Sequence, residues 1–340
     1  MSGTVLVTGA SGYIAGFAIR QLLAEGWQVQ GTIRHLSRAE EVRATLGVTA
    51  AELPLFAADL LSDDGWVEAM AGCSHVLHVA SPVPSTVPKH DDELIVPARD
   101  GALRALKAAA AAGVKRVVLT SSVAAITYGH GKLVDRVYTE ADWSDVNSPA
   151  TGAYAKSKTI AERAARDWVA ANDKGLEFAT INPGMVVGPA LGPDFSTSLE
   201  VVRRLINGAM PGLPRLGFSI VDVRDVADAH VKALTAPGID GERFIVAGDS
   251  FLWLDEIAAI LKARLGPRAA KVPTRALPDM FVRVAALFNP PLKLILSELG
   301  RHRALSSAHV KERLGIRFRP AGDSLAEAAN SLIDAGIVKV

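Results

Sequence analysis

TVLVTGASGYIAG, residues 4–16, decides the fold of this chain. The apolar run at 4–8 reads as a strand, and it leads into a turn in which Gly9 and Gly12 are three residues apart. Glycine is needed where a backbone turns tightly and approaches a phosphate, and a helix beginning there offers free N–H groups. This order at the first strand–helix junction predicts a dinucleotide-binding Rossmann domain.

The chain up to residue 250 alternates short β-rich runs with helical patterns. Strands are predicted at 4–8, 28–33, 54–57, 75–79, 115–121, 176–182 and 242–246. Helices are predicted at 12–25, 63–71, 93–112, 151–172 and 223–235. Several strands are continuous apolar runs, as expected when helices cover both faces of a parallel sheet. The fold class is therefore α/β, a Rossmann doubly wound parallel sheet.

The later chain has a different composition, because Pro and Gly become frequent after Pro183. After Trp253 the pattern is mostly helical, with helices predicted at 253–265, 276–288 and 322–335. We predict that residues 1–183 and 220–250 form the dinucleotide-binding domain. Residues 184–219 and 251–340 are predicted to form a smaller, mostly helical C-terminal substrate-binding lobe.

The composition is that of an ordinary globular protein: 340 residues, 49% apolar, 21% charged and a net charge of +1. This charge gives no reason to expect nucleic acid or a membrane as partner. A single cysteine, Cys73, is expected to be buried and fits a reducing, cytoplasmic location. No basic segment precedes the run at 4–8, so no signal peptide is expected. The apolar segment 276–299 is interrupted by Asn289-Pro290-Pro291 and is expected to pack over a substrate cavity.

The end of the second strand indicates which dinucleotide is bound. NAD usually requires an Asp or Glu there, whereas this strand is followed by Arg34 and Arg38. Guanidinium groups pair with a 2′-phosphate that a carboxylate would repel. The expected cofactor is NADP(H), with Asp59 and Leu60 near the adenine.

Tyr154 and Lys158 are the candidate acid–base pair. Their i, i+4 spacing places both on one face of a helix. A tyrosine has a pKa of about 10, and a cation one turn away is expected to lower it toward the working range. Ser122 ends a predicted strand at the carboxyl edge of the sheet, where ligands bind, and can hydrogen-bond a substrate carbonyl oxygen. No metal site is expected, since no pair of histidines has ligand spacing on one helix.

The chain resembles an extended short-chain dehydrogenase/reductase, and within that superfamily the dihydroflavonol 4-reductase-like branch with its microbial aldehyde and ketone reductases. The matching segments include VTGASGYIAG (7–16), VKRVVLTSSVAAI (114–126), YAKSK (154–158) and INPGMVVGP (181–189). The resemblance implies NADPH-dependent, reversible reduction of an aromatic or hydrophobic aldehyde or ketone. Tyr154 would donate the proton, Lys158 would assist it, and Ser122 would orient the substrate oxygen. It also implies a homodimer through helices 93–112 and 151–172.

Two sets of contact residues are expected. The dinucleotide set is Gly9, Ser11, Gly12, Tyr13, Ile14, Arg34, Arg38, Asp59, Leu60, Ala80, Ser81, Thr120, Tyr154, Lys158, Pro183, Gly184 and Val186. The substrate set is Pro82, Val83, Thr127, Met185, Phe195 and Phe218. Thr127 stands where the plant flavonoid reductases have an asparagine, which disfavours a flavonoid substrate.

Three other functions were weighed. A nucleotide-sugar epimerase or dehydratase shares the fold and the Tyr–Lys pair, but the dehydratases carry an Asp-Glu pair where this chain has Val123-Ala124. A hydroxysteroid dehydrogenase relative would use segment 276–299 as a membrane-associating helix. A non-catalytic dinucleotide sensor typically loses Tyr or Lys, and both are present.

Overall fold

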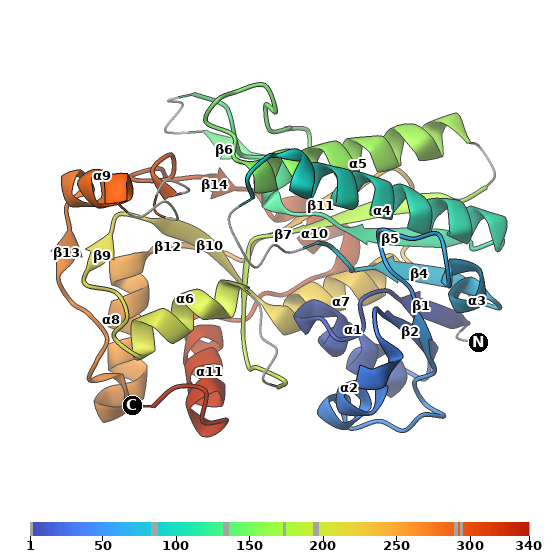
Figure 1. Ribbon diagram of the computed structural model, residues 1–340, viewed down its shortest axis with the longest axis horizontal. Coiled ribbons are helices and arrows are strands. Elements are labelled where there is room, and N and C mark those ends of the chain that lie inside the picture. The colour runs from blue at the N-terminus through green and yellow to red at the C-terminus, as the bar shows by residue number, and fades with distance from the viewer. Residues whose placement is uncertain are drawn as a thin grey trace.

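Seven parallel strands form the central sheet, in the order β11-β7-β5-β4-β1-β2-β3 (Figure 1). Their bounds are β1 Thr4–Val7, β2 Gln28–Ile33, β3 Leu55–Ala57, β4 His75–His78, β5 Arg116–Thr120, β7 Glu177–Pro183 and β11 Arg243–Val246. The computed structural model describes residues 3–82, 88–131, 136–172, 175–192, 197–288, 292 and 295–339. The strand order reverses between β1 and β4, and in such sheets ligands bind beyond the carboxyl ends of the strands at that point.

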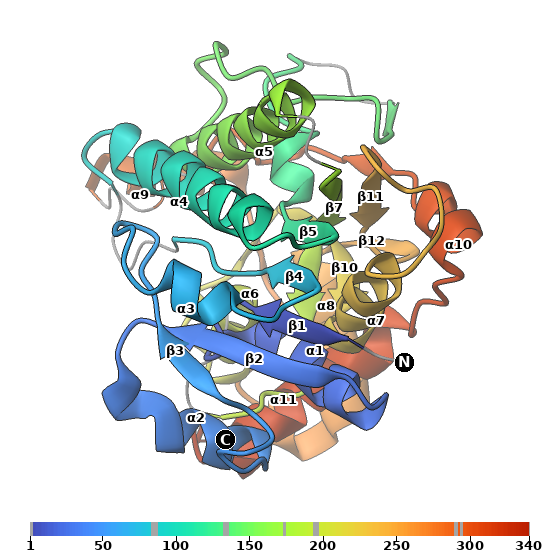
Figure 2. The same cartoon turned by 90° about the vertical axis from the view of Figure 1, so that its right-hand side faces the viewer.

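Helices cover both faces of this sheet (Figure 2). Their bounds are α1 Tyr13–Ala24, α2 Ala39–Leu46, α3 Trp66–Met70, α4 Asp92–Ala111, α5 Ala153–Ala171 and α7 Val223–Ala233. Val5 and Val7 of β1 share a buried cluster with α1 and α7, whereas Leu6 shares another with α3, α4 and α5. Burial on both faces explains why the strands read as continuous apolar runs.

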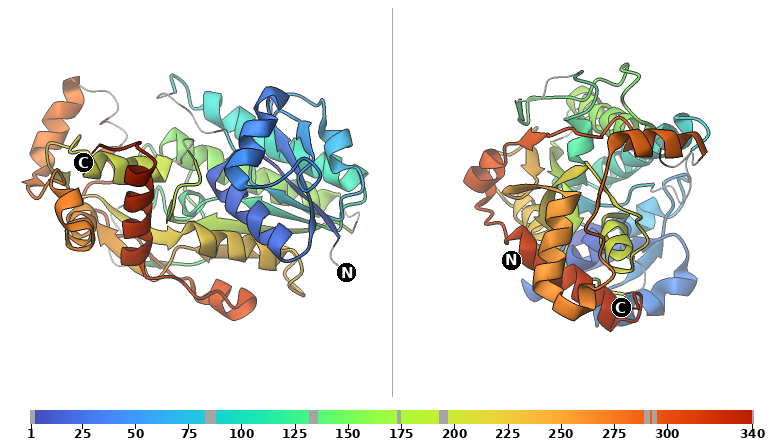
Figure 3. Two further views of the ribbon diagram at one scale, coloured as in Figure 1. Left: turned by 90° about the horizontal axis from the view of Figure 1, so that it is seen from below. Right: turned by 90° about the vertical axis from the view of Figure 1, so that its left-hand side faces the viewer.

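A second group of elements lies beside the carboxyl ends of the central strands (Figures 1 and 3). A three-stranded sheet joins β8 (Met185–Val187), β10 (Gly217–Asp222) and β12 (Ser250–Trp253) in the order β12-β10-β8. Two small pairs join β9 (Leu213–Pro214) with β13 (Ala276–Leu277), and β6 (Val137–Tyr138) with β14 (Ala304–Leu305). The helices are α6 Thr197–Ile206, α8 Leu254–Leu265, α9 Asp279–Phe288, α10 Ala308–Leu314 and α11 Ala321–Asp334.

The predicted fold class and all seven predicted strands of the central sheet are confirmed. The sequence did not reveal α2, α6, α10 or the three-stranded sheet, so the later chain is less purely helical than expected. Segment 220–250 supplies β11 to the central sheet, but β10 pairs with β8 and β12. The division into two lobes stays a prediction.

Segment 276–299 contains β13 and the ten-residue helix α9. Val282 and Ala286 are buried, whereas Phe281 and Phe288 are 64% and 85% exposed. In the part of the chain that the structure describes, no helix has the length and apolar character needed to cross a bilayer.

Candidate active site

A groove of about 670 Å³ extends over the carboxyl ends of the central strands. The turn after β1, the ends of β2, β4 and β5, helix α5 and the β7–β8 junction all contribute to its walls. This volume lies within the range of about 300–1,000 Å³ that is typical of small-molecule and cofactor sites.

The glycine turn forms one end of the groove. Gly9 adopts φ +68°, a conformation that favours glycine, and a Cβ atom there would lie 3.1 Å from Ala80. Its N–H donates to Thr32 Oγ1 at 3.1 Å, which fixes the turn against β2. Gly12 precedes α1 without a capping side chain, so the first amides of that helix face the groove free of a cap. This cradle fits a dinucleotide pyrophosphate.

Most residues of the expected dinucleotide set line this groove. They are Gly9, Ser11, Gly12, Tyr13, Ile14, Arg34, Asp59, Leu60, Ala80, Ser81, Thr120, Tyr154, Lys158, Pro183, Gly184 and Val186. Arg34 is exposed at the end of β2. Arg38 instead lines a small adjoining hollow beside Ser11 and Gly12, and its guanidinium donates to Glu41 at 2.8 and 3.0 Å.

Ser122, Tyr154 and Lys158 line the same groove from two directions. Ser122 follows β5 and caps the short helical turn Val123–Ala125, with Ala124 N donating to its Oγ at 3.1 Å. Tyr154 lies at the start of α5, and its hydroxyl is hydrogen-bonded to Ser122. One turn later, Lys158 Nζ donates to the backbone carbonyl of Thr120 at 3.3 Å. Three groups able to polarise and protonate a carbonyl thus meet at one place.

The protonation of the pair differs from the expectation. Surrounding protein raises the pKa of Tyr154 above its usual value, although the hydrogen bond with Ser122 lowers it. The predicted lowering of this pKa is therefore not found, since the Lys158 ammonium is directed to Thr120. Burial lowers the pKa of Lys158 to about 8, while the negative charge of Glu162 raises it. Both side chains are protonated at neutral pH.

The expected substrate residues fare differently from the cofactor set. Pro82 lines the groove, whereas Val83 and Phe195 lie outside the described residues. Thr127 is 4% exposed, is not part of the groove lining, and donates through Oγ1 to the Val123 carbonyl at 3.2 Å. Placing Thr127 at the substrate was therefore wrong in this geometry, because its side chain completes a local turn.

Two further substrate expectations concern the small sheet and α9. Met185 and Phe218 lie on β8 and β10, and neither is among the residues that line the groove. No described residue of α9 lines it either, so packing of 276–299 over the cavity is not found. The residues were chosen for apolar character near glycine-rich loops, but strand pairing directs them into the small sheet.

Sequence reasoning missed several residues of the groove. Trp66 lines it and donates through Nε1 to the carbonyls of Asp59 and Ser62 at 3.2 and 3.0 Å. Glu93 and Pro97 contribute from the start of α4, and Ser121 from the end of β5. Ser121 could have been found, because it stands next to Ser122 in the same strand-end motif. Trp66 carries no such signal, since it lies on a short helix outside any recognised motif.

The remaining titratable candidates are structural. Cys73 is 5% exposed, as expected, and burial raises the pKa of its thiol to about 11. His78 is a packed strand residue, as expected, at 2% exposed and hydrogen-bonded to Thr8. Among the described residues, no group of three His, Cys, Asp or Glu side chains could hold a metal ion.

Comparison with known proteins identifies relatives of this chain. Residues 5–247 match the model of the NAD dependent epimerase/dehydratase family. Cinnamoyl-CoA reductase CAD2 of Medicago truncatula is 38% identical over 252 residues, 72% of this chain and 76% of that protein. An anthocyanidin reductase ((2S)-flavan-3-ol-forming) of Vitis vinifera is 32% identical over 290 residues, 80% and 83% of the two chains. The solved structure of yeast methylglyoxal/isovaleraldehyde reductase Gre2 complexed with NADPH superposes with a TM-score of 0.82 and 25% identity, covering 98% and 100% of the chains.

Proposed function

We propose, since this chain belongs to the NAD dependent epimerase/dehydratase family and is an NAD(P)-dependent oxidoreductase of the extended short-chain dehydrogenase/reductase type, that it reduces an aldehyde or ketone to an alcohol with NADPH. The observation that carries this proposal is the meeting of Ser122, Tyr154 and Lys158 in the groove that the glycine turn closes. The printed names of the relatives support it, because they are reductases.

The chain's own residues supply the acid–base part of the reaction. Ser122 and Tyr154, hydrogen-bonded to each other, present hydroxyl groups to the carbonyl oxygen of the substrate. Tyr154 donates its proton to that oxygen, and its raised pKa keeps it protonated and ready to donate at neutral pH. The Lys158 cation stabilises the phenolate left on Tyr154. NADPH, when bound, supplies the hydride that the carbonyl carbon receives.

The preference for NADPH rests on Arg34. This guanidinium is exposed at the end of β2 and lines the groove, and the position carries no carboxylate to repel a 2′-phosphate. Asp59 and Leu60 line the groove from the loop after β3 and would flank the adenine. Arg38 is held by Glu41 in the adjoining hollow, so we assign it a smaller part.

Arg34→Ala is expected to weaken NADPH binding by about tenfold while leaving NADH binding within about twofold. The loss reflects one charge-assisted hydrogen-bonding group to the 2′-phosphate. Calorimetric titration of the purified protein with each dinucleotide measures both values. Arg38→Ala is the matched control and should have a smaller effect. Equal weakening of NADPH and NADH in Arg34→Ala would contradict the assignment of Arg34 to the phosphate.

The substrate is proposed to be an aromatic or otherwise hydrophobic aldehyde or ketone. Pro82, Pro88 and Leu94 contribute apolar surface to the groove near Ser122 and Tyr154. The test is consumption of NADPH with a panel of aromatic and aliphatic aldehydes and ketones. Turnover of a nucleotide sugar without net NADPH consumption would instead favour the epimerase alternative. A dehydratase is disfavoured, because Val123 and Ala124 follow Ser122 and can transfer no proton.

We also propose a homodimer formed through the outer faces of α4 and α5, which lie side by side on one face of the sheet (Figure 2). The resemblance to the reductase branch supports this arrangement. Light scattering coupled to size exclusion should give about twice the 35.8 kDa mass of the chain. A monomeric mass at micromolar concentration would contradict the proposal. The cytoplasmic location stays a prediction.

A further inference from the structure

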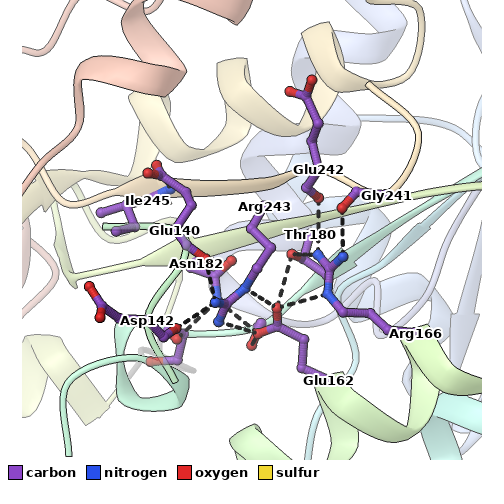
Figure 4. Close-up of polar contacts among 12 residues, drawn as sticks. Glu140, Asp142, Glu162, Arg166, Thr180, Asn182, Gly241, Glu242, Arg243 and Ile245 are labelled. Atoms are coloured by element: carbon purple, nitrogen blue, oxygen red, sulfur yellow. Dashed lines mark hydrogen bonds and ion pairs between the residues drawn. The ribbon is translucent and has the colours of Figure 1, made fainter. Parts of the chain in front are cut away.

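We propose that Glu162 is a positioning residue of the active site, which holds the Ser121–Ser122 segment in place and sets the charge around Lys158. This inference rests on the proposed reductase function. Glu162 lies one turn beyond Lys158 on α5, and its side chain is 0% exposed. Figure 4 shows that donors from β7, β11 and α5 converge on its carboxylate.

The two carboxylate oxygens of Glu162 have different sets of partners. Oε1 accepts from Arg243 Nε at 2.6 Å, Arg166 Nε at 3.3 Å and Thr180 Oγ1 at 3.2 Å. Oε2 accepts from Ser121 Oγ at 2.5 Å and from Asn182 Nδ2 at 2.9 Å, with Arg243 Nη2 at 3.5 Å. One oxygen therefore anchors the scaffold, and the other faces the end of β5.

The second oxygen connects directly to the catalytic serine. Ser121 immediately precedes Ser122, and Asn182 Nδ2 also donates to the Ser122 carbonyl at 3.2 Å. Ser122 is thus held on both sides, through the side chain of Ser121 and through its own carbonyl. A displacement of this segment would also move Thr120, whose carbonyl accepts from Lys158. Placement of catalytic groups to within a fraction of an ångström is worth large factors in rate.

The charge of Glu162 is as important as its hydrogen bonds. Burial opposes ionisation, but Arg243, Arg166 and the hydrogen bonds from Arg243 and Ser121 hold the pKa of this carboxyl below its usual value. The resulting negative charge raises the pKa of Lys158 against burial. The other charged or titratable groups acting on this region are Tyr154, His78, Arg166, Arg243 and Asp240.

A purely structural role would be to join α5 to β11 through the Glu162–Arg243 pair. Ser121→Ala and Thr180→Val separate the two roles, because each removes one hydroxyl that donates to the same carboxylate. Ser121→Ala releases the catalytic segment, whereas Thr180→Val acts on the β7 side and leaves both attachments of Ser122 intact. Thr180 does not line the groove.

We expect Ser121→Ala to lower kcat by about tenfold with little change in the KM for NADPH, and Thr180→Val to leave kcat within about twofold of wild type. Thermal unfolding should show similar losses of stability in the two variants. Equal kcat values for Ser121→Ala and Thr180→Val would overturn the positioning role.

Glu162→Gln tests the charge, since it retains an acceptor oxygen but removes the negative charge. Competitive amine labelling of the protein across about pH 6–10, read by mass spectrometry at Lys158, should give a pKa roughly one unit lower than in wild type. This measurement needs no substrate turnover, so it distinguishes the inference from the proposed function: a wild-type protein inactive toward every carbonyl compound would sink the latter alone. An unchanged labelling profile in folded Glu162→Gln would overturn the charge role. If this variant does not fold, the comparison of Ser121→Ala with Thr180→Val decides the proposal.

Discussion

Tyr154→Phe is expected to lower kcat for carbonyl reduction by about 10²–10⁴-fold, with little change in NADPH binding. The substitution keeps the ring, which is 45% exposed in the groove, and removes the hydroxyl that Ser122 contacts. Without it, the oxygen of the substrate has no positioned proton donor, because Lys158 is directed to the Thr120 carbonyl. The rate follows from the consumption of NADPH under saturating substrate.

A matched control for Tyr154→Phe is Tyr138→Phe. Tyr138 lies on β6, is 4% exposed and does not line the groove, so the same chemical change there should leave kcat within about twofold. Dinucleotide titration of both variants separates loss of chemistry from loss of binding. If Tyr154→Phe retained half or more of the wild-type kcat, Tyr154 would not be the proton donor.

The fold could be predicted from local patterns, because the signals of a Rossmann domain are short in sequence. Continuous apolar runs identified β1, β5 and β7, and two glycines three residues apart located the turn that begins α1. These features follow from burial on both sides of a sheet and from the φ of +68° at Gly9. The short strands β8 and β12 carry too few residues for a period to be recognised.

The candidate site was only partly accessible from the sequence. The motif order brought Ser122, Tyr154 and Lys158 into one groove, as expected. The contacts of Glu162 could not be predicted, since its partner Arg243 is 81 residues away and lies on β11. The pKa of Tyr154 was also beyond reach, because spacing on a helix does not show that the Lys158 ammonium turns toward Thr120. Side-chain direction depends on tertiary contacts that a local pattern does not encode.

Two buried histidines next to the site should make the protein sensitive to acid. His78 shares a hydrogen bond with Thr8 at 2.9 Å, and burial lowers its pKa to about 3. His230 is 0% exposed and burial lowers its pKa to about 4, against a usual value of 6.5. Its Nδ1 lies 2.8 Å from the Val226 carbonyl and must donate, so its Nε2 accepts from Thr120 Oγ1 at 2.7 Å. Both rings are therefore neutral in the folded protein.

The free energy of unfolding is expected to fall as the pH drops from 6.5 toward 5. In this window the unfolded chain protonates both histidines and the folded chain does not, so the unfolded state binds more protons and stability declines with falling pH. Near pH 5 the two groups together contribute a slope of about 2.7 kcal/mol per pH unit, which is large against a total stability of about 5–15 kcal/mol. Urea unfolding at a series of pH values measures this slope.

His230→Gln should reduce that slope by about half, to roughly 1.4 kcal/mol per pH unit, because one of the two protons is no longer taken up. The slope is informative even if the variant is less stable at every pH, since it counts protons and not contacts. His90→Gln, at an exposed position, should leave the slope unchanged. A slope that stays the same in His230→Gln would mean that His230 is already charged in the folded protein. That charge would require its Nε2 to donate, and Thr120 could then no longer donate its hydroxyl proton to the ring.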